Sequence, residues 1–472
     1  MAGYIGSTNQ VFGGDEVGAM VLDMGGTTTR CGYGGEEGPR CVIPSVVGFL
    51  PEDAAEAAKQ MGKAPQKTLI DQQLGLPRAG LELRPALSDG VINNWDAVER
   101  LWHHALVGTL RSNPAEHPLL LSEPTHTTVD IRAKTVQLMF EKHAPPAVYL
   151  ANNAVLTSFA FGRPTSLVLK SGGTTTSAVP VYEGHVMTKG LTRSTITGDA
   201  LGDLLVQTLQ AKGDVLRPRT TFVRRESPPG SGTFAVSNVD PSLTSSSFRK
   251  FWMLDLAKDM KTRCCRTSLY PHLIAASEDI EKYEMPDGST VDLKADLVWG
   301  LAEKMFTRAG EQPGAPGSDE SKPGIVPAGT TPAGLTFPDL VEQAVNKVDV
   351  DLKRELYGNI IATGGNTLWP GFSQRLGRIL GTRLPQRVRV KFHTPSTVRA
   401  PFPYRTILRR YGPCNTVRGS AEYWTCVCRS CAPVLSPLRR LSMFAAGGRT
   451  ALQQLDRRFN IVIVGDVPPA VD

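Results

Sequence analysis

The stretch VLDMGGTTTR, residues 21–30, decides the fold prediction. An apolar run ends at Asp23, and two glycines, three threonines and Arg30 follow before the chain becomes extended again. This order predicts a strand, a tight turn and a second strand. Glycines let the backbone approach a ligand closely, and the amides and hydroxyls of such a turn can surround a phosphate. The G-x-x-x-x-G-K-[ST] spacing of a P-loop is absent, so an ordinary glycine-rich hairpin is the alternative for this stretch alone.

A second copy of the pattern, SLVLKSGGTTTS, occupies residues 166–177. An apolar strand again enters a Gly/Thr turn and leaves as a strand, but Lys170 stands where the first copy has its aspartate. A third Gly-rich turn, IIATGGNT at 360–367, precedes a helix-like stretch. Two such hairpins on separate halves, followed by a Gly-Gly turn, are the layout of the superfamily of sugar kinases, chaperones and actin.

Longer blocks of the sequence resemble actin, in order along the chain. They include VLDMGGTTTRCGYGGEEGPR, DGVINNWDAVERLWHHAL, AVYLANNAVLTSFAFGRPTSLVL and IIATGGNTLWPGFSQRLGRIL. Within the actin family, FRKFWMLDLAKDMKTRCCRTSLYP resembles the nuclear actin-related proteins of chromatin complexes, the class numbered four. The resemblance covers residues 14–396. It implies an α/β, actin-like ATPase fold, with a ribonuclease-H-like five-stranded mixed sheet in each of two lobes and a ligand cleft between them.

The resemblance also predicts the order of the domains. A disordered N-terminus at 1–13 precedes lobe one at 14–155. The small outer subdomain of lobe one covers about 45–85, and lobe two covers 156–396. The outer subdomain is reshaped relative to actin, where its loop contacts neighbouring subunits, so this region argues against polymerisation.

Two insertions interrupt lobe two, at 214–247 and 309–334. Both lack periodicity and are rich in residues typical of loops, which predicts surface segments. The first insertion is also rich in arginine, which suits either an acidic partner or, as the favoured interpretation, a solvated loop. These arginines are Arg217, Arg219, Arg224 and Arg225.

Residues 397–472 form an Arg-rich tail without family resemblance, as a retained intron or frameshift would produce. The tail holds eleven arginines, no lysine and four acidic residues, so its net charge of +7 equals that of the whole chain. The actin-like part is therefore neutral, and charge gives no argument for nucleic-acid binding. A zinc site is the weaker alternative for the tail, because its cysteines have irregular spacing. They are Cys414, Cys426, Cys428 and Cys431.

Size and composition are those of a globular protein. The chain has 472 residues, 41% of them hydrophobic and 21% charged, which is enough for two or more compact domains. It contains no run of about 18 apolar residues and no secretory-signal pattern, so no membrane association is predicted. Eight cysteines, with Cys264 and Cys265 adjacent, favour a reducing compartment, either nucleus or cytoplasm. The resemblance selects the nucleus.

Apolar periodicity predicts the main helices. In DGVINNWDAVERLWHHAL the helical spacing begins at Val91, with Asp89 or Asn94 as the N-cap. His103 and His104 in this stretch lack acidic or Cys partners at ligand spacing, so they are not predicted to bind a metal. Further helices are predicted at 131–143, 197–213, 337–348 and 371–380, and a buried strand at 118–124.

The resemblance implies a nucleotide site in the cleft. Its residues come from both hairpins, from one helix of lobe two and from the third Gly-rich turn, and the implied cofactor is ATP. The nucleotide-binding residues are Asp23, Gly25, Gly26, Thr27, Arg30, Ser171, Gly172, Gly173, Thr174, Lys261, Gly364, Gly365 and Asn366.

Hydrolysis of the actin type needs Mg²⁺ held through water by carboxylates on both hairpins. Asp23 matches the first carboxylate, whereas Lys170 and Gly173 replace the acids of the second hairpin. An Asp-to-Lys change alters the local charge by two units and disfavours Mg²⁺. No catalytic residue and no metal site are therefore predicted. ATP binding remains an option, with Lys170 pairing with a phosphate, but efficient hydrolysis is not expected.

Four further positions depart from the actin pattern. Asn153 stands where actin has the glutamine that positions the attacking water, and Ser177 stands where it has a histidine. Arg30 replaces a phosphate-contacting lysine and keeps its charge. Thr262 replaces the glutamate that would hold the ribose.

Three functions follow from the resemblance. The favoured one is a non-catalytic subunit of nuclear chromatin-remodelling and histone-acetyltransferase complexes, which pairs with actin on a helix of the main ATPase or scaffold subunit and is open to histone or nucleosome contact. The second is an actin-like, nucleotide-binding cytoskeletal protein, which would need the missing carboxylates. The third is a small-molecule kinase, which would need a catalytic aspartate near the start of the second half, and none is matched there.

Overall fold

The computed structural model describes residues 18–34, 36, 38–51, 68–226, 234–270, 280–307, 334–394 and 461–462. Several predictions lie outside these ranges. They are the disordered N-terminus at 1–13, nearly all of the insertion at 309–334, and all of the tail except Ile461–Val462, including its four cysteines.

Lobe one is built on a mixed sheet whose strand order is β21-β10-β9-β1-β2-β3. β10, β9 and β1 are parallel, whereas β1, β2 and β3 are antiparallel. β1 and β9 are covered on both faces, which explains their continuous apolar runs. The strands are β1 (Met20–Met24), β2 (Thr28–Tyr33), β3 (Cys41–Pro44), β9 (Leu119–Glu123), β10 (Val148–Asn152) and β21 (Ile461–Val462).

Two helices cover lobe one, α2 (Trp95–His103) and α3 (Val129–His143). The helix predicted from Val91 starts later, because Val91–Ile92 is strand β8 and pairs with β7 (Leu87–Ser88). Asp89 lies in the turn between these strands at φ 52°, so it cannot be the N-cap. Asn94 is the N-cap, and its side chain accepts a hydrogen bond from the amide of Ala97 at 3.1 Å.

Lobe two repeats the arrangement with a sheet ordered β13-β12-β11-β19-β20, and β14 also pairs with β12. β11, β19 and β20 are parallel, and β11 and β12 form the antiparallel hairpin. In the part of the chain that the structure describes, each large sheet has six strands, one more than expected, because β21 and β14 add to the core. The strands are β11 (Ser166–Ser171), β12 (Thr176–Tyr182), β13 (His185–Val186), β14 (Thr192–Ser194), β19 (Ile360–Thr363) and β20 (Phe392–His393).

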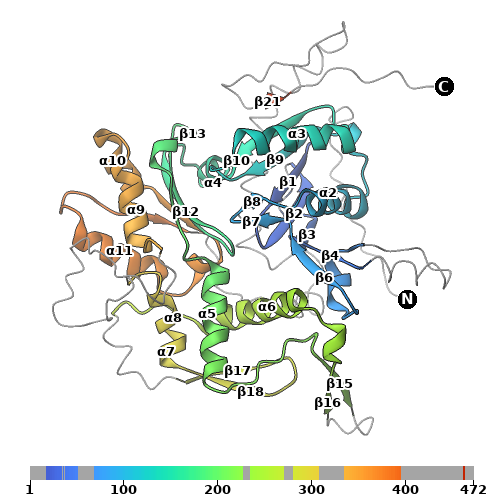
Figure 1. Ribbon diagram of the computed structural model, residues 1–472. Coiled ribbons are helices and arrows are strands. Elements are labelled where there is room, and N and C mark those ends of the chain that lie inside the picture. The colour runs from blue at the N-terminus through green and yellow to red at the C-terminus, as the bar shows by residue number, and fades with distance from the viewer. Residues whose placement is uncertain are drawn as a thin grey trace, which may run out of the picture.

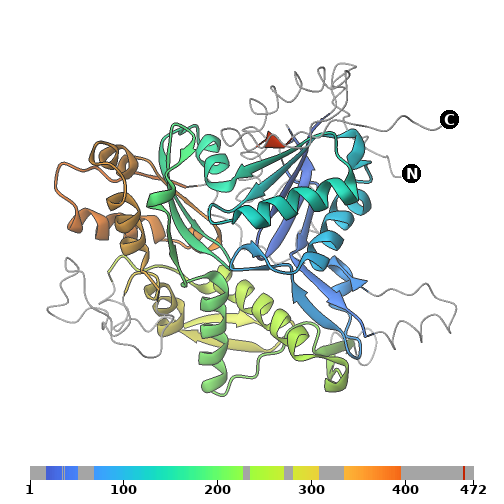
Figure 2. The ribbon, with the colours of Figure 1, turned by 45° about the horizontal axis from the view of Figure 1, so that its top comes forward.

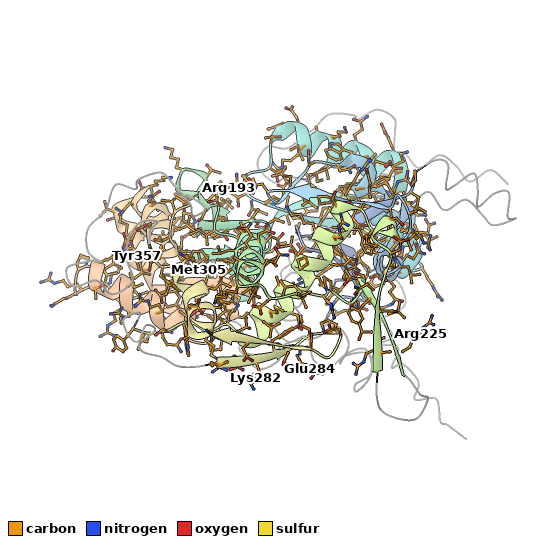
Figure 3. The ribbon with its side chains drawn as sticks, turned by 60° about the horizontal axis from the view of Figure 1, so that its bottom comes forward. Arg193, Arg225, Lys282, Glu284, Met305 and Tyr357 are labelled. Carbon is orange, nitrogen blue, oxygen red and sulfur yellow. The ribbon has the colours of Figure 1, made fainter. Side chains whose placement is uncertain are left out.

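The helices of lobe two pack against its sheet and against one another around a core of apolar side chains. Phe306, Phe337 and Phe372 meet in this core with ring centroids 5.6–6.4 Å apart. Figure 3 shows Met305 and Tyr357 within the same lobe. The helices are α5 (Gly198–Ala211), α6 (Ser246–Cys264), α7 (Ala295–Val298), α8 (Gly300–Glu303), α9 (Phe337–Asn346), α10 (Val350–Gly358) and α11 (Phe372–Arg383).

Smaller sheets complete both lobes. The outer subdomain of lobe one has strand order β5-β4-β6, formed by β4 (Val46–Phe49), β5 (Thr68–Leu69) and β6 (Glu82–Pro85). Lobe two carries two hairpins, β15 (Phe222–Glu226) with β16 (Phe234–Asn238), and β17 (Ile280–Glu284) with β18 (Thr290–Lys294). The first insertion, predicted to be a loop, thus contains the hairpin β15–β16, which projects from the body and carries Arg225 (Figure 3).

The two lobes lie side by side (Figures 1 and 2). α4 (Asn153–Ala160) contacts β10 of lobe one and β11 of lobe two, so the predicted boundary at 155 falls inside a helix that both lobes share. α6 extends from lobe two toward β6 of lobe one. None of the helices described here is long and apolar enough to cross a membrane.

Protonation of His143 is expected to destabilise lobe one. Its side chain is 8% exposed, and its Nε2 atom is buried without a hydrogen-bond partner. Burial lowers the pKa of His143, the charge of His103 lowers it further, and Glu99 opposes both effects. The unfolded chain therefore binds a proton more readily, so stability should fall as the pH drops below about 6.5. His143→Phe should make this pH dependence of urea unfolding shallower, whereas the same change at exposed His185 should leave it unchanged.

Candidate functional site

Both predicted Gly/Thr hairpins form. In the first, the amide of Gly25 donates to the carbonyl of Thr28 at 3.0 Å and closes the turn between β1 and β2. In the second, the amide of Gly172 donates to the carbonyl of Thr175 at 2.8 Å and closes the turn between β11 and β12. The same turn geometry therefore recurs in each lobe.

The two turns touch each other between the lobes. A Cβ atom on Gly26 would overlap the side chain of Thr174. A Cβ atom on Gly173 would likewise overlap the hydroxyl of Thr27. A glycine of each turn thus packs against a threonine of the other turn. The two are so close that only a residue without a side chain fits at the glycine position.

Backbone hydrogen bonds from the start of α5 hold the second turn in place. The amide of Gly198 donates to the carbonyl of Gly172 at 2.9 Å. The next amide, that of Asp199, donates to the carbonyl of Gly173 at 2.8 Å. Thr197 caps the helix by accepting from the amide of Ala200. The first helical amides are therefore used within the chain.

The third Gly-rich turn packs against the end of β11. The side-chain amide of Asn366 donates to the hydroxyl of Ser171 at 2.9 Å. Gly364 has φ 100°, and a Cβ atom there would overlap the carbonyl oxygen of Ser171. Gly365 follows at the start of a 3₁₀ turn that ends at Leu368. The structure therefore joins the third turn to the second hairpin.

Gly364→Ala is expected to lower the free energy of unfolding by about 2–3 kcal/mol, because the left-handed backbone and the contact with a backbone oxygen both oppose a side chain. Urea unfolding measures the loss. Gly365→Ala is the matched control, since a Cβ atom there meets nothing within 4 Å. Equal losses at the two positions would contradict this account.

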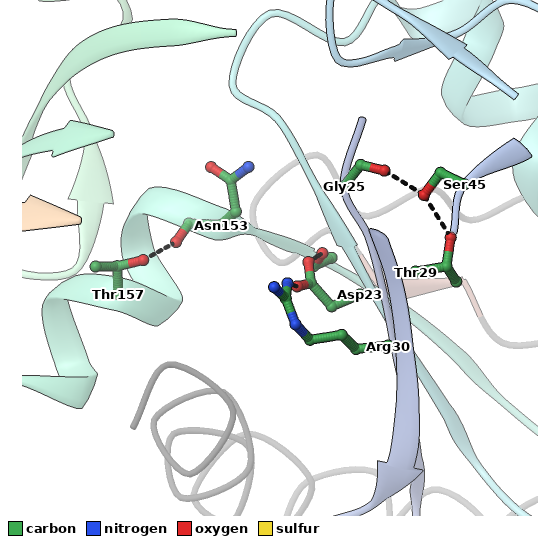
Figure 4. A network of polar contacts seen from close by, with 8 residues as sticks. Asp23, Gly25, Thr29, Arg30, Ser45, Asn153 and Thr157 are labelled. Atoms are coloured by element: carbon green, nitrogen blue, oxygen red, sulfur yellow. Dashed lines mark hydrogen bonds and ion pairs between the residues drawn. The ribbon is translucent and has the colours of Figure 1, made fainter. Parts of the chain in front are cut away.

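Asp23 is buried between cationic side chains. Its carboxylate pairs with Arg30 at 3.3 Å and accepts a hydrogen bond from the hydroxyl of Ser122 (Figure 4). Lys170 of lobe two interacts electrostatically with both members of this pair. Burial lowers the pKa of Lys170, Asp23 opposes that effect, and Arg30 adds to it. One carboxylate therefore stands among two basic groups, which repel a divalent cation.

The other departures from the actin pattern lie near this cluster or turn away from it. Asn153 begins α4 and lies in the same region as Asp23 and Arg30 (Figure 4). Ser177 lies directly opposite Lys170 in the β11–β12 ladder. Thr262 is exposed, and its hydroxyl donates to the carbonyl of Lys258 on its own helix at 2.7 Å. Thr262 therefore does not contribute a cleft contact.

Lys261 lies in α6 and is 6% exposed. Its ammonium donates to the carbonyl of Gly198. Burial lowers the pKa of Lys261 to about 8, and Asp199 opposes this shift. Asp199 was not among the predicted site residues. The sequence shows that Asp199 is an acidic residue in the first turn of a helix. It does not show that its partner is Lys261, which lies in α6.

A model of the actin family, described as Actin, matches residues 14–402. The chain belongs to the actin family. It is 35% identical over 404 residues to actin-related protein 4 of Arabidopsis thaliana, an alignment that covers 81% of this chain and 89% of the relative. The protein of the same name from Oryza sativa subsp. japonica is 34% identical with the same coverage. That of Schizosaccharomyces pombe is 30% identical over 401 residues, 83% of this chain and 89% of the relative.

The resemblance to actin is thus confirmed as family membership, and the actin-like α/β fold in two lobes is confirmed with it. The matched range ends slightly beyond residue 396, where the resemblance was predicted to stop. For the actin family an ATP and its Mg²⁺ are the implied ligands of the cleft, so their fit depends on the side chains just described.

The chemistry of the cleft fits a phosphate and does not fit a divalent cation. Arg30 contributes a positive charge, Lys170 belongs to the same cluster although burial lowers its pKa, and the hydroxyl of Thr27 is buried without a hydrogen-bond partner. Within the described ranges, no three His, Cys, Asp or Glu side chains come together as metal ligands. The only predicted acidic ligand, Asp23, is already paired with Arg30.

Proposed function

We propose that this actin-family chain is a non-catalytic subunit of nuclear chromatin-remodelling and histone-acetyltransferase complexes. In these it pairs with actin on a helix of the main ATPase or scaffold subunit, with the helix in an apolar groove between the lobes. The likeness to proteins named actin-related protein 4 supports the assignment to this branch. Nuclear localisation and contact with histones or nucleosomes belong to the same proposal.

The observation that carries the non-catalytic part is the charge around Asp23. Mg²⁺-dependent phosphoryl transfer needs carboxylates that hold the cation. Here Asp23 is paired with Arg30, and Lys170 stands where the second hairpin would need a carboxylate. The site therefore favours a phosphate anion over a metal, and turnover is not expected.

A bound ATP would be held by the residues that the resemblance implies. Arg30 and Lys170 would neutralise its phosphates, and the Gly-rich turns would offer amides and the free hydroxyl of Thr27. Lys261 would lie at the nucleoside end. Bound nucleotide would stabilise the folded, closed chain by mass action and would not drive a cycle.

The alternative, a cytoskeletal protein that polymerises, is less well supported. Filament formation requires an outer subdomain that is free to contact a neighbouring subunit. In this chain the outer subdomain packs onto α6 of lobe two through Leu69 and Leu74. That packing restricts movement of the outer subdomain relative to lobe two.

Mass spectrometry of proteins that co-purify with the N-terminally tagged chain from nuclear extract tests the proposal. Actin together with a remodelling ATPase or an acetyltransferase scaffold is the expected result. Recovery of cytoskeletal proteins alone would contradict it and favour the alternative. A matched purification of tagged actin shows which partners are specific to this chain.

A further inference from the structure

An apolar cluster joins α6 of lobe two to the outer subdomain of lobe one. Phe248 and Trp252 lie in the first half of α6 and are 0% and 6% exposed. This helix extends from lobe two toward β6 of lobe one (Figures 1 and 2). Both side chains pack onto the outer subdomain of lobe one. We call this group the clasp, and its buried members are Val46, Leu69, Leu74, Leu81, Leu83, Phe248 and Trp252.

Hydrogen bonds accompany the clasp. Nε1 of Trp252 donates to the carbonyl of Leu74 at 3.2 Å. The N-cap hydroxyl of Ser245 donates to the carbonyl of Leu81 at 2.6 Å. The guanidinium of Arg219 lies over the ring of Trp252, 4.4 Å from its centre. The buried polar atom of the tryptophan is therefore satisfied by the opposite lobe.

The two Gly/Thr turns also lie against each other between the lobes. Thr174 fits against Gly26, and Thr27 fits against Gly173, in the space between the hairpins. Gly90 of lobe one also approaches the methyl group of Thr175 so closely that a Cβ atom would stand 2.6 Å from it. Side chains of the protein itself thus fill the gap between the turns.

An ion pair crosses the lobes beside these turns. The carboxylate of Asp89, in the β7–β8 turn, pairs with the guanidinium of Arg193 in β14. A ring nitrogen of His126 lies 3.0 Å from the backbone oxygen of Asp89 and holds that turn in place. The pair is partly exposed, so its contribution is smaller than that of the clasp.

We propose that these contacts hold the lobes closed without nucleotide. Three of the groups that would recognise ATP already have partners within the chain: Asp23 has Arg30, Lys261 has Gly198, and Asn366 has Ser171. Closure of the two lobes therefore does not require a ligand. This inference deepens the proposed function, because a subunit whose lobes stay closed presents one constant surface to its partners. Only that effect on partners rests on the proposed function.

Hydrogen exchange measured by mass spectrometry on the full, nucleotide-free chain tests this inference. Peptides that contain the two turns, residues 20–33 and 166–182, should be protected without ATP. Adding ATP in the presence of EDTA should change their exchange rates by less than about twofold. Trp252→Ala should raise exchange at both turns by about tenfold or more and make it sensitive to ATP.

Trp369→Ala is the matched control, because Trp369 is also 6% exposed but lies in the core of lobe two. It should destabilise the protein without raising exchange at the turn of lobe one. Trp252→Phe keeps an aromatic ring in the cluster and replaces the alanine variant if that variant does not fold. It removes the hydrogen bond to Leu74, so it should raise exchange at the turns by less than Trp252→Ala does.

Two results would overturn the inference. One is rapid exchange of the turns in the nucleotide-free wild-type chain with strong protection on adding ATP. The other is unchanged exchange at the turns in both Trp252 variants. Neither result depends on partners or on turnover, so failure of this inference is distinguishable from failure of the proposed function.

Discussion

Glu303→Ala is expected to lower the free energy of unfolding by about 3–5 kcal/mol. Glu303 is 3% exposed and pairs with Arg375, which is 2% exposed, at 3.4 Å. The guanidinium also donates to the carbonyl of Leu269 at 2.9 Å. Without this carboxylate the buried guanidinium loses this ion pair, which the surrounding apolar side chains cannot replace. Urea unfolding followed by circular dichroism measures the loss.

The control is an ion pair of similar length at the surface. Glu281 pairs with Arg266 at 3.3 Å, but both side chains are about 40% exposed. Water solvates either partner when the other is removed, so Glu281→Ala should cost about 1 kcal/mol or less. Equal losses for the two glutamate variants would show that burial of the Glu303–Arg375 pair does not decide its importance.

Lys170→Asp is expected to tighten Mg²⁺-dependent nucleotide binding by about 100-fold or more. The variant places a second carboxylate opposite Asp23 and removes a positive charge from the same site. At an effective dielectric constant of about 20, a change of two charge units within one site alters the free energy of cation binding by a few kcal/mol. A difference of about 1.4 kcal/mol corresponds to a tenfold change in a binding constant. Calorimetric titration with ATP, in Mg²⁺ and in EDTA, measures the difference.

The matched control is Lys189→Asp, the same change at an exposed lysine of lobe two. It alters the net charge equally and should leave Mg²⁺ dependence unchanged. If Lys170→Asp and wild type bind nucleotide with the same Mg²⁺ dependence, the basic charge at Lys170 does not exclude the cation. A second carboxylate alone is not expected to restore turnover, because Asn153 and Ser177 also depart from the actin pattern.

Local features of this chain are predictable from its sequence. Both Gly/Thr hairpins follow from apolar strands that flank glycines, since turn and strand signals lie within a few residues of one another. The helices α3, α5, α9 and α11 follow from their periodicity and, in most cases, from a Thr N-cap. The start of α2 is not predictable in this way, because Val91 continues the helical spacing although it belongs to a strand.

Contacts between the lobes are not predictable from one sequence. Thr27 and Gly173 meet because two sheets and a shared helix bring their turns together, and neither residue signals the other. From the sequence, Trp252 can be recognised only as an apolar residue of a helix. Nothing in the sequence indicates that its indole donates a hydrogen bond to the carbonyl of Leu74. The resemblance therefore proposes individual site residues, whereas their pairing within the chain required the fold.

Turnover of ATP by the purified chain tests the central claim most directly. Phosphate release should be measured with saturating ATP and Mg²⁺, beside Asp23→Ala and a sample in EDTA. We expect the wild-type rate to equal both controls, because Asp23 is paired with Arg30 and interacts electrostatically with Lys170. Sustained Mg²⁺-dependent release that Asp23→Ala abolishes would contradict the account and identify a working ATPase.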